Sequence, residues 1–201
     1  MDIKRKTAET YDKIASVYSN TRVTHFWVDE FDFFKSIFDG NKVIDFGCGE
    51  GRDAMIFIQN GFDYMGIDIS QGMLKIAQER VPAGIFQQAD FHKVDFAAGT
   101  FDGFWTAASF IHVPKKDIHT VLQEAKRVTK TGGIGFISMK EKTDMDEGMV
   151  CEDRYGGMGR YFSFYTQDEF KRILEENGFS ILKFATHAEG KNNWLCYFVK
   201  A

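Results

Sequence analysis

The chain has 201 residues, of which 44% are hydrophobic and 27% are charged, and it contains two prolines. This length and composition predict a single folded domain over residues 1–201 and exclude disordered and collagen-like classes. The formal net charge of -4, with no cluster of lysine and arginine, makes nucleic acid an unfavourable partner.

Two helices are expected before the first strand. Tyr11, Ile14, Ala15 and Tyr18 follow the i, i+3, i+4, i+7 spacing of a helix with one apolar face. Residues 26–38 are dense in aromatic side chains at near-helical spacing, and Gly40 supplies a stop signal. These segments predict a helical N-terminal cap over about residues 1–40.

Strands and helices then alternate along the chain. Strands are expected at residues 43–46, 64–67, 85–87, 101–107 and 134–139, and helices at residues 52–60, 70–80 and 117–129. Ser70 is the expected N-cap of the second helix, and Gly132 and Gly133 are expected to end the third. The alternation predicts right-handed crossovers and a mainly parallel sheet within a core of about residues 41–140.

A lid and a C-terminal hairpin are expected over about residues 141–201. The glycine-rich stretch 141–161 is predicted to be irregular, as binding loops often are. Thr166 and Glu169 form a capping box for a helix at residues 167–177, which Gly178 ends. Strands at residues 180–185 and 194–199 flank turn residues and are expected to pair antiparallel.

Membrane and metal sites are not expected. The N-terminus is polar, and no apolar run reaches membrane-spanning length, so a cytoplasmic location is predicted. Cys48, Cys151 and Cys196 are isolated, and the five histidines lack a paired ligand motif. We therefore expect no dedicated metal site, although folding could still bring two ligands together.

The sequence DFGCGEG at residues 45–51 follows the first expected strand. Glycines allow a sharp turn and a close approach of the backbone to a ligand. The helix that begins there presents free amides and the positive end of its dipole to an anionic group such as a carboxylate. A purely structural tight turn would have the same pattern, so this motif alone does not establish a binding site.

Two acidic residues follow the next two strands and point to the same ligand. Asp68 ends the second strand, where a carboxylate can accept two hydrogen bonds from a ribose diol. Asp90 follows the third strand, where it can accept from an adenine amino group while Phe91 or Ile69 flanks the ring. Either aspartate alone would equally suit a turn or a helix cap, but their joint order favours a nucleotide site.

Five segments of this chain, taken in order, resemble successive blocks of the small class I S-adenosylmethionine-dependent methyltransferases, whose pattern is VLDxGCGxGR, then GxDxS, then a further Asp. They cover about residues 42–140 and are VIDFGCGEGRDA, GIDISQGMLKIA, QQADF, FDGFWTAASFIHVP and EAKRVTKTGGIGFISMK. KTGG stands where the family usually has KPGG. The resemblance implies a three-layer, Rossmann-like α/β sandwich with a seven-stranded, mainly parallel sheet and an antiparallel C-terminal hairpin strand.

The resemblance also implies that S-adenosyl-L-methionine is the cofactor and S-adenosyl-L-homocysteine the product. Asp68 is then expected to hold the ribose, Asp90 with Phe91 the adenine, and the glycine turn the methionine moiety. Tyr11 and Tyr18 match a YDxxAxxY pattern of helices that cover the cofactor, although a core stripe explains both equally well. The expected cofactor contacts are Tyr11, Tyr18, Asp45, Gly47, Cys48, Gly49, Asp68, Ile69, Asp90, Phe91 and Ala107.

The chemistry expected is an in-line displacement, to which an enzyme contributes positioning and exclusion of water. If the acceptor must lose a proton, His112 is the candidate base, because it follows the fourth strand at the same sheet edge. A capping or packed histidine is the alternative for this position.

The acceptor is expected to be a small molecule. Its pocket is expected to be formed by the aromatic segment from His25 to Phe34 and by the loop from Arg154 to Tyr165. There Tyr161, Phe162, Phe164 and Tyr165 would wall a pocket for an apolar or planar molecule, and Arg154 or Arg160 would meet an anionic group. The same aromatic residues also suit a core, and the arginines suit a solvated surface.

Two other functions stay open. A nucleotide-dependent oxidoreductase has a similar glycine turn, but its pattern requires glycine or alanine where this chain has Arg52. A cofactor-binding protein without catalysis would share the fold. The oligomeric state is not predicted.

Overall fold

The computed structural model describes residues 3–21, 26–190 and 192–201. The helices in these ranges are α1 (Ile3–Thr21), α2 (Val28–Ile37), α3 (Ala54–Gln59), α4 (Gln71–Arg80), α5 (Ile118–Val128) and α6 (Gln167–Glu176). The strands are β1 (Lys42–Phe46), β2 (Asp63–Asp68), β3 (Ile85–Gln88), β4 (Phe101–Ala107), β5 (Thr129–Glu141), β6 (Glu147–Cys151), β7 (Gly159–Tyr165), β8 (Ser180–Glu189) and β9 (Asn192–Lys200).

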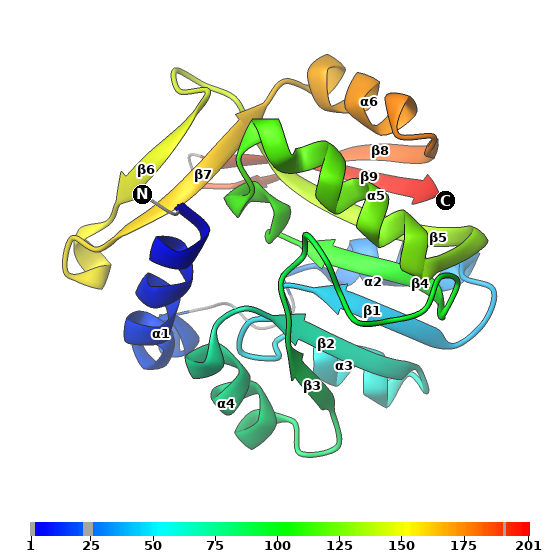
Figure 1. Ribbon diagram of the computed structural model, residues 1–201, viewed down its shortest axis with the longest axis horizontal. Coiled ribbons are helices and arrows are strands. Elements are labelled where there is room, and N and C mark those ends of the chain that lie inside the picture. Colours follow the sequence, from blue (N-terminus) through cyan, green and yellow to red (C-terminus); the bar gives the residue numbers. More distant parts are fainter. Residues whose placement is uncertain (1–2, 22–25, 191) are drawn as a thin grey trace.

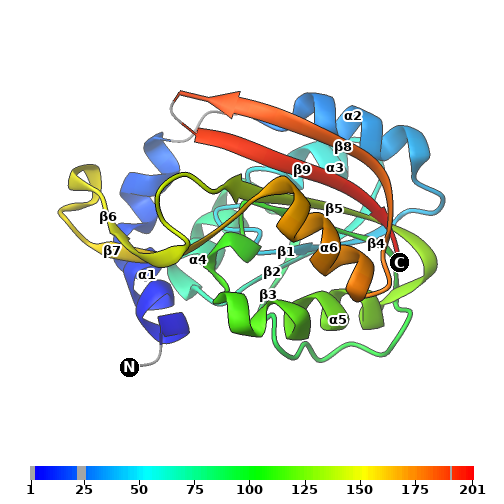
Figure 2. The same cartoon turned by 90° about the horizontal axis from the view of Figure 1, so that it is seen from above.

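Five parallel strands form the centre of the sheet in the order β3-β2-β1-β4-β5. β9 pairs antiparallel with β5, and β8 pairs antiparallel with β9, so the C-terminal hairpin completes this edge. Helices α2 and α3 lie on one side of the sheet, and α5 and α6 lie on the other (Figures 1 and 2). The predicted three-layer α/β sandwich with a mainly parallel sheet is therefore confirmed.

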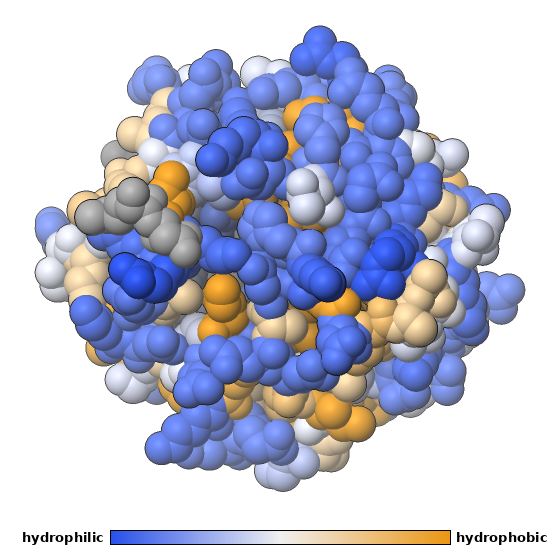
Figure 3. Space-filling view, viewed as in Figure 1, coloured by the Kyte–Doolittle hydropathy of each residue, from blue (hydrophilic) through white to orange (hydrophobic). Residues whose placement is uncertain are grey.

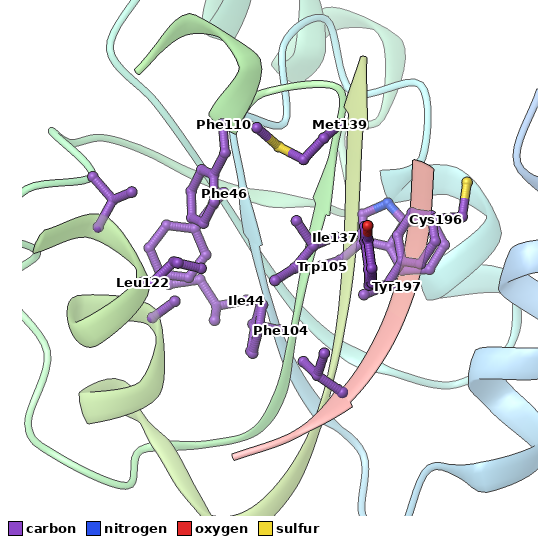
Figure 4. Packing of buried hydrophobic residues seen from close by; sticks show 14 of the residues in the cluster. Ile44, Phe46, Phe104, Trp105, Phe110, Leu122, Ile137, Met139, Cys196 and Tyr197 are labelled. Carbon is purple, nitrogen blue, oxygen red and sulfur yellow. The ribbon is translucent and has the colours of Figure 1, made fainter. Parts of the chain in front are cut away.

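The core lies between the central strands and the helices on both faces (Figure 4). Trp105 of β4 stacks on Phe136 of β5 with ring centroids 4.1 Å apart, and both side chains are almost completely buried. Helix α5 adds the apolar stripe that its sequence spacing predicts, with Val121, Leu122 and Ala125 buried. This packing fixes the strand ends, at which the ligand-binding residues are expected.

The predicted count of seven strands is wrong, because the described residues form a sheet of nine. Seven of them are the expected strands, and β6 and β7 come from the region around the stretch 141–161 that was expected to be irregular. β7 pairs parallel with Lys140 and Glu141 of β5, beyond the point at which β4 ends, and β6 pairs antiparallel with β7. The many glycines in this stretch favoured a prediction of irregular structure. In the extended strand that forms instead, Arg160 and Phe162 face one side and Tyr161 faces the other.

The predicted end of α5 at residue 129 is correct to within one residue, but the predicted role of Gly132 and Gly133 as its stop is wrong. The helix ends at Val128, and the chain enters β5 at Thr129, which pairs with Phe101. Gly132 and Gly133 therefore lie inside β5, at an irregularity in its pairing with β4. A side chain at Gly133 would lie 2.5 Å from the carbonyl oxygen of Asp102, so close backbone packing requires glycine there.

Local signals for the helix starts are confirmed. The Ser70 hydroxyl accepts a hydrogen bond from the Met73 amide at 3.2 Å, as an N-cap does. Thr166 and Glu169 form the reciprocal bonds of a capping box at the start of α6. These helix starts can be predicted from the sequence because the two residues that form each capping hydrogen bond lie only three positions apart.

Hydrophilic residues cover most of the face seen in Figure 3, with small separated apolar areas. None of the helices in the described ranges is long and apolar enough to cross a membrane.

The capping box provides a direct test of the α6 start. Replacing Thr166 with Ala removes the acceptor for the Glu169 amide, and we expect the free energy of unfolding to fall by about 1 kcal/mol in urea denaturation. Thr166→Ser keeps a hydroxyl and should retain most of that stability. Equal stability of the alanine and serine variants would contradict a contribution from the cap.

Candidate functional site

An open cavity lies at the carboxyl ends of the parallel strands. Residues that follow β1, β2, β3 and β4 line one side of it, and helix α1 lines the other. Figure 1 shows α1 beside these strand ends. All the residues expected to contact a cofactor line this cavity, as does His112.

The turn after β1 is shaped by two glycines in different ways. Gly47 has φ of 79°, and a side chain there would lie 2.2 Å from the Ser109 side chain. Gly49 has φ of 53°, and a side chain there would meet no atom within 4 Å. Gly47 is therefore required for packing, whereas Gly49 leaves the backbone open to the cavity.

Asp68 lies at the end of β2, where its carboxylate braces the turn. Its Oδ2 accepts a hydrogen bond from the Gly49 amide at 3.0 Å, and its Oδ1 accepts from the Ser70 amide at 2.9 Å. Burial raises the pKa of Asp68 to about 6, although these amide bonds oppose the shift. The carboxylate thus has well-placed donors and still faces the cavity.

Asp90 follows β3 and also lines the cavity. It loses its proton more readily than Asp68, because its pKa is lowered whereas that of Asp68 is raised. Burial acts against its charged form, but hydrogen bonds from Lys4 and His92 outweigh that effect and lower the pKa of Asp90. Lys4 belongs to α1, so this ion pair joins the helix to the strand edge. Phe91 also lines the cavity, beside Asp90.

Asp45 is buried at the end of β1 and has a different environment. Burial raises the pKa of Asp45 well above its ordinary value, and Asp53 adds to this shift. The Tyr64 hydroxyl donates to Asp45 Oδ2 at 2.6 Å. Cys48 packs beneath the turn, where its Sγ would lie 2.9 Å from a side chain at Gly66. Among the expected contacts, Asp45 and Cys48 are thus held within the protein's own packing.

A hydrogen-bonded chain connects α1 to His112 and β7. His112 Nδ1 lies 2.5 Å from the Tyr161 carbonyl oxygen, an acceptor only, so this nitrogen carries the proton. In the neutral ring His112 Nε2 then accepts from the Tyr11 hydroxyl at 2.7 Å. Arg160 Nη1 donates to the same Tyr11 oxygen at 3.0 Å. The histidine is therefore oriented by groups from two other elements.

Several cavity residues were not expected from the sequence. Lys4, Thr7 and Ala8 extend the α1 face beyond the two tyrosines, and Arg52 follows the glycine turn. Arg52 donates to Asp53 through Nε and Nη2 at 2.6 and 3.1 Å. The continuing helical spacing before Tyr11 was the available signal for the α1 residues, and the position of Arg52 directly after Gly51 was the signal for the arginine.

A second cavity adjoins the first and shares Tyr11, Tyr18, Arg52, Ala108 and His112 with it. Its remaining lining residues are Phe26, Ile111, Lys140, Arg154, Arg160, Phe162, Glu189, Gly190, Asn192 and Trp194. It therefore extends from the junction toward β5, β7 and the β8–β9 hairpin.

The expected aromatic wall of this region is only partly correct. Phe162 lines the second cavity, but Tyr165 is fully buried against Phe170, and Tyr161 and Phe164 are not among the lining residues. Alternate residues of β7 face opposite sides, which separates Phe162 from its two tyrosine neighbours in the predicted set.

The aromatic segment 25–34 also contributes less than expected. Phe26 lines the second cavity, whereas Phe31 and Phe34 are core residues. His25 lies outside the described residues. The predicted arginines both line the cavity, with Arg160 buried and Arg154 largely exposed.

Comparisons with known proteins agree on one family. Residues 43–133 match the family described as "Methyltransferase domain". "Methyltransferase GfsG" of Streptomyces halstedii is 28% identical over 160 residues, which are 75% of this chain and 56% of that protein. The chain belongs to the class I S-adenosylmethionine-dependent methyltransferases. S-adenosylmethionine is the cofactor of this family, and the chain spans about half the length of the curated relatives it matches.

Solved structures share the fold at low sequence identity. A Burkholderia thailandensis 1,6-didemethyltoxoflavin-N1-methyltransferase, crystallised with bound 1,6-didemethyltoxoflavin and S-adenosylhomocysteine, has a TM-score of 0.72 and 18% identity, covering 100% of this chain and 91% of that one. The [4+2]-cyclase SpnF has a TM-score of 0.74 and 16% identity, covering 96% and 94%. The same fold thus occurs in a protein named as a methyltransferase and in one named as a cyclase, so the fold alone does not determine the reaction.

The raised pKa of Asp68 predicts a pH dependence of stability. An ordinary aspartate in the unfolded chain loses its proton near pH 4, whereas folded Asp68 keeps it to about pH 6. The unfolded state therefore binds fewer protons in this window, and the free energy of unfolding falls as pH rises through it. Asp68→Asn should remove up to roughly 3 kcal/mol of this fall, measured as urea stability at pH 4 and pH 7.

Buried Asp45 contributes a change of the same sign in both proteins, so the difference between the two pH profiles reports Asp68. Parallel profiles for the wild type and Asp68→Asn would show that Asp68 titrates normally.

Proposed function

We propose that this protein transfers a methyl group from S-adenosylmethionine to a small-molecule acceptor by in-line displacement. The observation that carries the proposal is the junction of two cavities at Tyr11 and His112, with the Asp68 and Asp90 carboxylates on the first cavity only. One cavity suits a nucleoside, and the other leaves room for an acceptor beside it.

The residues present fit the cofactor. The open backbone at Gly49 leaves space where a side chain would otherwise project, and Asp68 is held by amides so that it can accept from ribose hydroxyls. Asp90 and Phe91 are assigned to the adenine, one as an acceptor and the other as an apolar wall.

When bound, S-adenosylmethionine supplies a methyl carbon already activated by a sulfonium. The protein's contribution is then to hold the two reactants in line and to exclude water. Helix α1 serves both purposes, because its residues cover the first cavity and Tyr11 reaches the second.

His112 is assigned as the base for an acceptor that must lose a proton. Its Nδ1–H is held by the Tyr161 carbonyl, which leaves Nε2 as the basic nitrogen. Tyr11 occupies that nitrogen here, so it must either move aside or relay the proton from the acceptor. Arg160 stabilises negative charge on the Tyr11 oxygen by its hydrogen bond, which favours the relay.

Cofactor binding is tested by calorimetry with S-adenosylmethionine, S-adenosylhomocysteine and NADH. We expect the two sulfur compounds to bind and Asp68→Ala to weaken both by roughly 100-fold, because two hydrogen bonds to a charged group are lost. Asp63→Ala, at the exposed start of the same strand, is the control and should bind normally. Binding of NADH in place of the sulfur compounds would indicate a nucleotide-dependent oxidoreductase instead.

Turnover is tested with acceptors found by a methyl-transfer screen of cell metabolites. For an acceptor that carries a proton on its nucleophile, His112→Gln should lower kcat by about 100-fold or more without weakening S-adenosylhomocysteine binding. Tyr11→Phe should lower kcat as well if the hydroxyl relays the proton. Unchanged turnover of His112→Gln across pH would remove the histidine from the mechanism, and cofactor binding without any turnover would favour a non-catalytic protein.

A further inference from the structure

We propose that the second cavity selects a planar acceptor that carries a negative charge, an inference that rests on the methyl transfer proposed above. The charge is placed near Lys140 and Arg154, at the end of the cavity away from the glycine turn, and Arg160 lies between that end and Tyr11. The nucleophilic atom is placed at the junction, beside Tyr11 and His112.

The charges around this cavity do not balance. Arg52 is paired with Asp53, but Arg154 and Arg160 share the single carboxylate of Glu152. Lys140 and Glu189 are the other charged residues in the lining. Among the described residues these groups are three cations and two carboxylates, and an anionic ligand would neutralise their net positive charge of one.

Arg160 is a buried cation with unused hydrogen-bonding capacity. Its side chain is almost completely buried, and its Nε–H has no hydrogen-bond partner within the described ranges. A buried donor without a partner is unfavourable, so an acceptor group from a ligand would stabilise it. A guanidinium prefers a planar anion with two oxygens, which matches a carboxylate.

Aromatic rings make the walls of the same space. Phe26, Phe162 and Trp194 all line the second cavity. Lys140 Nζ lies 4.7 Å from the Phe162 ring centroid and 5.4 Å from the Trp194 ring, so the cation is held between two aromatic surfaces. A flat ring can lie against these surfaces while its ionised substituent faces the cations.

The junction between the cavities sets where the acceptor must react. Ala108, which lines both cavities, has a positive φ of 59°, an uncommon conformation for a residue with a side chain. Its amide donates to the Ser138 hydroxyl at 2.7 Å, which fixes the passage between β4 and β5. The acceptor is therefore bound with its anionic end and its nucleophilic end on opposite sides of the ring.

The test compares 4-hydroxybenzoate with 4-hydroxybenzamide, which have the same ring and differ in charge. Binding to the full chain, saturated with S-adenosylhomocysteine, is measured by calorimetry. We expect the benzoate to bind at least about tenfold more tightly than the amide. Lys140→Met should weaken the benzoate by about tenfold and leave the amide unchanged, and Arg154→Gln, at an exposed side chain, should act in the same direction.

Lys183→Met is the matched control, because Lys183 also lies over an aromatic ring, 3.9 Å from the centroid of Phe33, but lines neither cavity. It should change neither affinity. Equal affinities for the two probes, or no binding of the benzoate at about 10 mM, would overturn the inference while S-adenosylhomocysteine still binds.

Two further outcomes separate the two proposals. If Lys140→Met weakens S-adenosylhomocysteine as strongly as the benzoate, the cations serve the cofactor and the inference is wrong. If the wild-type protein fails to bind S-adenosylhomocysteine, the proposed function fails first.

Discussion

The hydrogen bonds between the turn after β1 and the end of β2 are the constraint on which the site depends. The amides of Gly47 and Cys48 both donate to the Ile67 carbonyl, at 2.8 and 3.0 Å, and the Gly49 amide donates to Asp68. These bonds can form only because β1 and β2 run parallel and end together. The turn and the carboxylate are therefore positioned as one unit before any ligand binds, which lowers the ordering cost of binding.

Helix α1 and strand β7 complete the site from the opposite side. Lys4 of α1 contacts Asp90, and Tyr11 lies between His112 and Arg160, so a single helix contacts the Asp90 side of the first cavity and the junction with the second. Arg160 in turn lies within about 6 Å of the ring centroids of Tyr11, Tyr18, Tyr155 and Phe162. Helix α1 therefore borders both cavities, through Tyr11 and Tyr18.

Local and periodic signals predicted most of the framework. The N-cap at Ser70, the capping box at Thr166 and the apolar stripe of α5 depend on residues within a few positions of one another, so one sequence contains the information. The extra strands β6 and β7 and the course of β5 through Gly132 and Gly133 were missed. Both features depend on pairing between distant segments, which overrides the local preference of glycine for turns.

The sequence by itself determined the order of elements, the glycine turn and the two aspartates at successive strand ends, because parallel strands bring their carboxyl ends to one edge. The tertiary structure alone decided which aromatic side chains reach the second cavity, since strand alternation turns Phe162 toward it and Tyr165 into the core. It also decided the environment of His112. The Tyr161 carbonyl and the Tyr11 hydroxyl come from segments 49 and 101 residues away, and no local pattern specifies such contacts.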